Sequence, residues 1–180
     1  MLPYTYTPQQ IISMINTCAS TGGNLLLNIG PMPDGTVPPE AVEPLHTVGA
    51  WLAANGEAVY GEKAIVGTTF RGCGVNMVSA SPDHNEIYLW NRIWQPGGKL
   101  QLGGYKKAPK SVSFLATGEK IDFEMDGHRL ILKNLPEEAP DKIAGITVIK
   151  LEFDGGDIYN YMSYYPHMRY GQNIAGDLVQ

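Results

Sequence analysis

The pattern of apolar and polar positions divides the chain into a first part with helical periodicity and a second part with a period of two. Residues 7 to about 61 have the pattern of a helix, a strand and a second helix. Thr7, Pro8 and Gln10 have the spacing of a capping box, and Gly22-Gly23 follow the last apolar position. We therefore expect the first helix between these two signals.

The sequence GNLLLNIGPMPDG, residues 23–35, is the strongest signal in the first part. Its four apolar residues are interrupted only by Asn28, and Gly30-Pro31 ends the run. A short, nearly continuous apolar run predicts a strand over 24–29 that is buried on both faces, as in parallel sheets. Such a strand leaves two unpaired apolar edges, so it requires neighbours that this chain does not contain.

The second helix is predicted from Pro38-Pro39 to the stop signal Asn55-Gly56. Pro44 lies inside it, where a proline removes a hydrogen bond and clashes with the preceding turn. We therefore expect a kink or a later start of this helix. Its apolar stripe consists of Val42, Leu45, Val48 and Leu52.

From about residue 65 to 153 the pattern has a period of two, and turn residues separate short segments. Asp126-Gly127 lies between two alternating segments and indicates a two-residue hairpin. Six to eight short strands with this density of turns predict an antiparallel sandwich.

Composition narrows the classes of partner. The net charge is −5 and the pI is about 5.3, which argues against a nucleic-acid partner. No apolar run approaches the ~20 residues of a membrane span, and no Cys or His spacing indicates a metal site. We expect no cofactor and no metal. Residues 1–4 carry no signal-peptide pattern, which leaves the localisation unknown.

With these residues in view, the chain resembles the C-terminal portion of the α-L-fucosidases of glycoside hydrolase family 29. The stretch GGNLLLNIGPMPDGTVPPEAVEPLHTVGAWLAANGEAVYG is similar to the family's last barrel strand, loop and barrel helix. The second part, from NEIYLWNRIW to GITVIKLEF, is similar to its C-terminal β-sandwich. Pro44 departs from the family pattern, which has a helix former there.

The resemblance implies a fold and a domain organisation. The fold is an α/β barrel remnant, consisting of helix, strand and helix, followed by an all-β antiparallel sandwich. Residues 1–62 would be the end of a (β/α) barrel catalytic domain, and 63–154 the sandwich. Residues 155–180 form a tyrosine-rich tail of unknown role.

The resemblance also implies an activity, the removal of terminal α-L-fucose from a fucosylated glycan or glycoside by a retaining mechanism. Such a mechanism requires a nucleophile and an acid/base about 5–5.5 Å apart. In the family both carboxylates precede the matched region, so the catalytic residues are expected upstream of this chain. Family members are often secreted, periplasmic or lysosomal.

Asn28 and Asp34 are the candidates for the substrate rim, because they match the family's strand-end motif. Asp34 has a simpler interpretation, the stabilisation of its own turn or the capping of the second helix. Glu57 follows the Asn-Gly stop, where it can bond backbone amides of the link between the two parts. Aromatic residues offer a sugar platform on the sandwich or fill its core: Tyr88, Trp90, Trp94 and Tyr105.

Two other functions remain open. In the first, several copies of a short glycoside hydrolase pair their orphan strands into a homo-oligomer and use local carboxylates such as Asp34 and Glu57. In the second, the sandwich is a non-catalytic carbohydrate-binding module, for which Trp94 is the residue to test.

Overall fold

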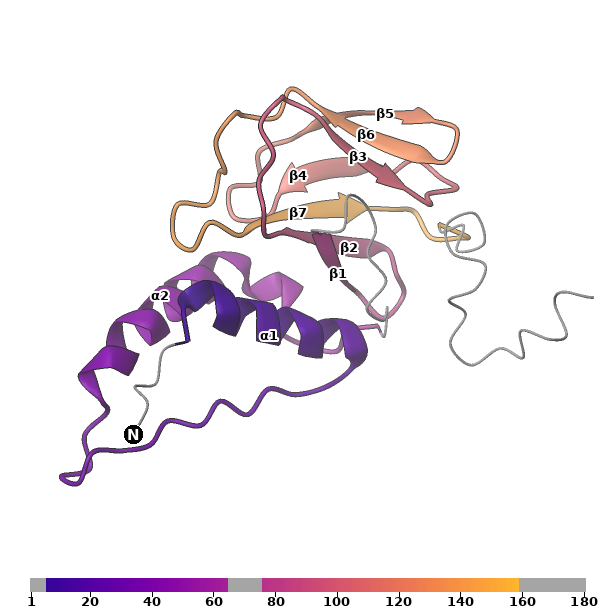
Figure 1. Ribbon diagram of the computed structural model, residues 1–180. Coiled ribbons are helices and arrows are strands. Elements are labelled where there is room, and N and C mark those ends of the chain that lie inside the picture. Colours follow the sequence, from indigo (N-terminus) through magenta and orange to yellow (C-terminus); the bar gives the residue numbers. More distant parts are fainter. Residues whose placement is uncertain (1–5, 65–75, 159–180) are drawn as a thin grey trace, which may run out of the picture.

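The computed structural model describes residues 6–64 and 76–158, which form three layers (Figure 1). The helical layer contains helices α1 (Pro8–Thr21) and α2 (Pro39–Asn55) and the 3₁₀ helix η1 (Gly56–Ala58). Sheet A has the order β1 (Asn76–Ala80), β2 (Glu86–Asn91), β7 (Thr147–Glu152), β4 (Ser111–Phe114). Sheet B has the order β3 (Leu100–Gly103), β6 (Arg129–Lys133), β5 (Asp122–Asp126). Sheet A lies between the helical layer and sheet B.

Helix α1 begins and ends where its sequence signals predict. The Thr7 hydroxyl accepts a hydrogen bond from the Gln10 amide at 3.3 Å, and the Gln10 side chain accepts one from the Thr7 amide at 2.8 Å. Both bonds of the capping box are therefore present. At the other end Gly22 adopts φ 74°, a left-handed conformation that closes a helix at little cost for glycine.

Helix α2 begins at Pro39 and runs through Pro44, so the predicted later start is wrong. Its anchor on sheet A is Trp51, which is fully buried and does not belong to the predicted stripe. The indole of Trp51 donates to the carbonyl of Ile146 at 2.8 Å, and its ring centroid lies 5.1 Å from that of Trp90. Val42, a member of the stripe, is 37% exposed.

The strand predicted over residues 24–29 does not form. The segment lies between α1 and α2 without secondary structure, and Leu26 is 92% exposed. Within the described part of the chain, residues 24–29 make no backbone hydrogen bond. A strand forms only by pairing with another strand, and no segment within residues 6–64 and 76–158 pairs with this one. The prediction of a buried strand is therefore wrong for this chain by itself.

The second part is an antiparallel sandwich of seven described strands, as its pattern predicts. Because side chains alternate across a strand, β2 directs Ile87 and Leu89 toward sheet B, and Tyr88 and Trp90 toward the helical layer. Sheet A is thus covered on both faces, which explains why β2 is buried nearly throughout.

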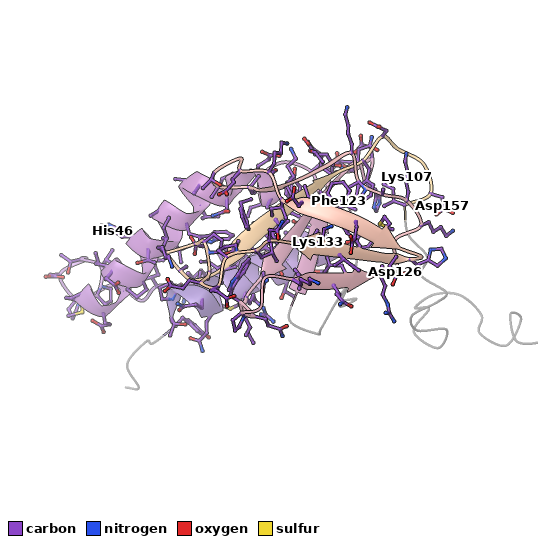
Figure 2. The ribbon with its side chains drawn as sticks, turned by 90° about the horizontal axis from the view of Figure 1, so that it is seen from above. His46, Lys107, Phe123, Asp126, Lys133 and Asp157 are labelled. Carbon is purple, nitrogen blue, oxygen red and sulfur yellow. The ribbon has the colours of Figure 1, made fainter. Side chains whose placement is uncertain are left out.

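The predicted hairpin joins β5 and β6, one residue later than expected. Asp126 pairs with Arg129, so the two-residue turn is Gly127-His128, with Gly127 at φ 55°. In the view from above, this hairpin and His46 of α2 lie at opposite ends of the molecule (Figure 2). Residues 159–180, which hold most of the predicted tail, lie outside the described residues, and the predicted domain boundaries stay predictions.

Candidate functional site

Asp34 forms the turn between the extended segment and α2. Its Oδ1 accepts hydrogen bonds from the Thr36 amide at 3.0 Å and the Thr36 hydroxyl at 2.7 Å. These bonds, the backbone one first, hold the pKa of Asp34 below its ordinary value. Two further bonds close the loop, from the Met32 amide to the Thr36 carbonyl and from the Gly35 amide to the Met32 carbonyl. The simpler interpretation of Asp34, a side chain that stabilises its own turn, accounts for its contacts.

Asn28 lies in the extended segment and is exposed. Its neighbours alternate between exposed and half-buried: Leu25, Leu27 and Ile29 are half-buried, and Leu26 is 92% exposed. The alternation is that of an extended backbone. The segment therefore presents a strand-like edge whose backbone groups are free within the described residues.

Asp34 and Glu57 do not form a catalytic pair within one chain. Asp34 precedes α2 and Glu57 follows it, and the 17 residues of α2 make a rod of about 25 Å. Retaining glycosidases need two carboxyl groups about 5–5.5 Å apart, and inverting ones about 6.5–9.5 Å. A site built from these two carboxylates would require a second copy of the chain.

Glu57 joins a charged cluster on sheet A and not the backbone amides that the sequence suggested. The Lys150 ammonium lies 2.6 Å from Oε1 of Glu57, 2.7 Å from Oε1 of Glu86 and 3.6 Å from Oε1 of Glu152. The Tyr88 hydroxyl lies 3.0 Å from both Glu57 and Glu86. One ammonium and one hydroxyl thus hold three carboxylates together.

The sequence pattern does not predict Lys150 or a place for Tyr88 in this cluster, because only the strand register brings the two residues together. Tyr88 pairs with Lys150, and Glu86 pairs with Glu152 directly across β2 and β7. Like charges at facing positions repel, and Lys150 lies between them. Burial lowers the pKa of Lys150, but its bonds to the carboxylates outweigh burial and raise the pKa above its ordinary value.

A groove of about 590 Å³ lies beside this cluster, between the β1–β2 turn and the end of β7. Its carboxylates already have partners within the protein. Asp83 accepts from Ser81 and Asn85, and Asp154 pairs with Lys110 at 3.6 Å. Asp83 and Asp154 therefore stabilise the loops that line the groove, and they do not form an acid/nucleophile pair.

The aromatic residues fill the core and do not form a sugar platform. Tyr88, Trp90 and Tyr105 are at most 1% exposed. The partly buried Trp94 packs against the core and Phe114, and its indole donates to the Pro136 carbonyl at 2.9 Å.

Among residues 6–64 and 76–158, no group of three His, Cys, Asp or Glu side chains is arranged to hold a metal ion. Neither of the helices in these ranges combines the length and the apolar character of a membrane span.

Comparisons with known proteins agree on one family. The sequence profile of the family Alpha-L-fucosidase matches residues 3–57. The tissue alpha-L-fucosidase of Rattus norvegicus is 50% identical over 132 residues, which are 73% of this chain and 28% of that protein. The tissue alpha-L-fucosidase of Mus musculus is 32% identical over 149 residues, which are 80% of this chain and 30% of that protein.

The fold leads to the same family. The structure is similar to alpha-L-fucosidase isoenzyme 1 from Paenibacillus thiaminolyticus, with a TM-score of 0.70 and 26% sequence identity. The match covers 84% of this chain and 35% of that one. The chain thus spans about 30% of the length of the curated relatives that it matches.

Proposed function

Because this chain is related to the C-terminal portion of the α-L-fucosidases of glycoside hydrolase family 29, we propose that it is the C-terminal part of such an enzyme. The enzyme is a retaining glycosidase that removes terminal α-L-fucose from glycans. The nucleophile and the acid/base come from polypeptide outside these 180 residues. The observation that carries the proposal is the ordered match, which includes both the helical part and the sandwich.

The helical layer is, on this proposal, the end of a (β/α) barrel. The support is physical: residues 24–29 are extended and apolar, lie between two helices, and have no strand partner among the described residues. Exposing Leu26 to water at 92% is unfavourable. Strands on either side of this segment would satisfy its backbone and cover its side chains.

Asn28 and Asp34 are the proposed rim residues. In a parallel barrel the carboxyl ends of the strands surround the substrate, and Asn28 and Asp34 lie at that end of residues 24–29. Asp34 would act by shaping the turn through Thr36, and Asn28 by direct contact, since its side chain is exposed.

The test is reconstitution of activity. The chain is produced alone and as a fusion behind the portion of the Rattus norvegicus relative that precedes the matched residues. Both proteins are assayed with an aryl α-L-fucoside after circular dichroism has verified their folding. We expect turnover by the fusion and none by the chain alone.

Two substitutions sharpen this test. Leu26→Asp places a charge in the proposed barrel wall and should abolish turnover by the fusion. Ile93→Asp is the matched control, because Ile93 is also apolar and is 60% exposed, but lies on a loop of the sandwich. A folded fusion without turnover, or enzyme-like turnover by the chain alone, would contradict the proposal.

Homo-oligomerisation is a second candidate, favoured by the same exposed segment. Several copies would pair their residues 24–29, and an active site would then require Asp34 of one copy near Glu57 of another. An active oligomer of the chain alone would identify this case.

A further inference from the structure

The helical layer is bound to sheet A at the two ends of β7, by different kinds of bond: at residues 144–146, just before β7, and at Lys150, near its other end. At one end, the Trp51 indole donates to the carbonyl of Ile146 at 2.8 Å, and the Gln9 amide donates to that of Ala144 at 3.1 Å. These bonds carry no charge. At the other end, η1 is held by Glu57, whose partners are Lys150 and Tyr88.

The charged end is partly shielded from water. The side chain of Lys150 is 14% exposed and that of Glu57 is 51% exposed. Glu57 and Lys150 are 93 residues apart in sequence, so their bond joins the helical layer to the sandwich. Ala58 is fully buried, and its carbonyl accepts from the Ser79 hydroxyl at 2.8 Å. These uncharged contacts keep η1 near the sheet when the charged bond is lost.

We propose that Glu57 is an acid-sensitive latch, which holds η1 against sheet A when it is ionised. Protonation of Glu57 removes its attraction to Lys150 and raises the frequency with which η1 opens. The sandwich stays folded. This inference concerns the docking of the two parts and does not depend on the proposed function.

Among residues 6–64 and 76–158, the charged groups that face Glu57 lie on sheet A or in the segment after η1. Partial burial raises the pKa of Glu57, but hydrogen bonds from Lys150 and Tyr88 and the charge of Lys150 outweigh it. The pKa is therefore lower when η1 is docked than when it is open. The facing titratable groups are Lys150 and Glu152 of β7, Glu86 and Tyr88 of β2, and Lys63.

The direction of the pH dependence follows from this lowering. A carboxyl whose pKa is lowered by docking stabilises the docked form above its ordinary value of 4.5. That stabilisation is lost as pH falls from about 5 through the docked pKa. The bonds from Trp51 to the Ile146 carbonyl and from Gln9 to the Ala144 carbonyl join uncharged groups that do not titrate in this range.

The experiment is hydrogen exchange of the whole chain at pH 7 and pH 4, with each rate divided by the intrinsic rate at that pH. The reporters are the amides of Val59 and Tyr60, which both donate to the Gly56 carbonyl. For wild type we expect the protection of these amides to fall about threefold at pH 4, in line with a partly exposed ion pair. Protection of β5 and β6 should stay unchanged.

Glu57→Gln removes the charge and keeps an acceptor at nearly the same place. At pH 7 its protection should already equal that of wild type at pH 4, and it should not change with pH. Glu124→Gln is the matched control, since Glu124 pairs with Lys133 at 2.8 Å on sheet B; Lys133 is labelled in Figure 2. Its η1 amides should behave as in wild type.

A measurement on wild type covers the case in which Glu57→Gln does not fold. Salt screens the Glu57–Lys150 attraction, so 0.5 M NaCl should lower the protection of Val59 and Tyr60 at pH 7 and have no effect at pH 4. Equal protection at both pH values, or a Glu57→Gln variant that keeps the acid response, would overturn the latch.

Discussion

Asn16 on α1 carries a buried amide whose Nδ2 and Oδ1 have no hydrogen-bond partner among the described residues. Its side chain is fully buried. Leaving such a group without a partner costs free energy, and leucine has nearly the same size. We expect Asn16→Leu to raise the free energy of unfolding by about 1 kcal/mol, measured by urea denaturation.

The same position gives a control of opposite sign. Asn16→Asp adds a charge to a site without a partner, which should destabilise the protein at pH 7. A loss of stability in Asn16→Leu as large as in Asn16→Asp would show that the amide makes a bond that the structure lacks.

Asp34 provides a pH prediction at the residue scale. Its pKa is lowered first by the bond from the Thr36 amide, so this bond is fully formed above the ordinary value of 3.8. It is lost as pH falls through the lower pKa of the folded turn. Below the lowered pKa of Asp34, hydrogen exchange of the Thr36 amide, followed by NMR, should become faster than its intrinsic pH dependence predicts. Asp34→Ala should show the faster exchange at every pH.

At the residue scale, the sequence predicts contacts between near neighbours in the chain but not contacts between distant residues. The capping box at Thr7 and Gln10 was predicted because all its partners lie within four residues. The partner of Glu57 was missed because Lys150 comes beside it only after β7 pairs with β2. Long-range electrostatic contacts depend on the register, which the local pattern does not contain.

At the scale of elements, α2 docks on sheet A through Trp51. Trp51→Phe removes the donor to Ile146 and leaves space beside Trp90. An unpaired buried carbonyl and a small cavity together should cost about 2 kcal/mol, measured by urea denaturation. Val42→Ala on the same helix is the control, because Val42 is 37% exposed and should change stability little. If the two substitutions lower the stability equally, Trp51 is not the residue that docks α2 on sheet A.

The elements differ in how well the local pattern predicts them. Strands β5 and β6 were predicted because they pair with each other across a two-residue turn. Residues 24–29 have an equally strong apolar pattern, but no strand pairs with them among the described residues. The apolar pattern expresses only a preference, because a strand forms only when another segment pairs with it.

For the whole molecule, the exposed segment makes association the expected behaviour of the chain alone. An unpaired apolar edge is a template for pairing with another chain. Light scattering should therefore give an apparent mass that rises with concentration. Leu26→Asp should suppress that rise without lowering the melting temperature of the monomer, because Leu26 is 92% exposed and contributes little to its core.

The control separates this edge from general surface hydrophobicity. Ile93 is 60% exposed and lies on a loop of the sandwich, away from residues 24–29 in the sequence. Ile93→Asp should therefore leave the association unchanged. If both substitutions suppress it equally, the association is non-specific, and residues 24–29 have no special role in it. If neither does, the segment is satisfied within the chain, and the need for barrel neighbours disappears with it.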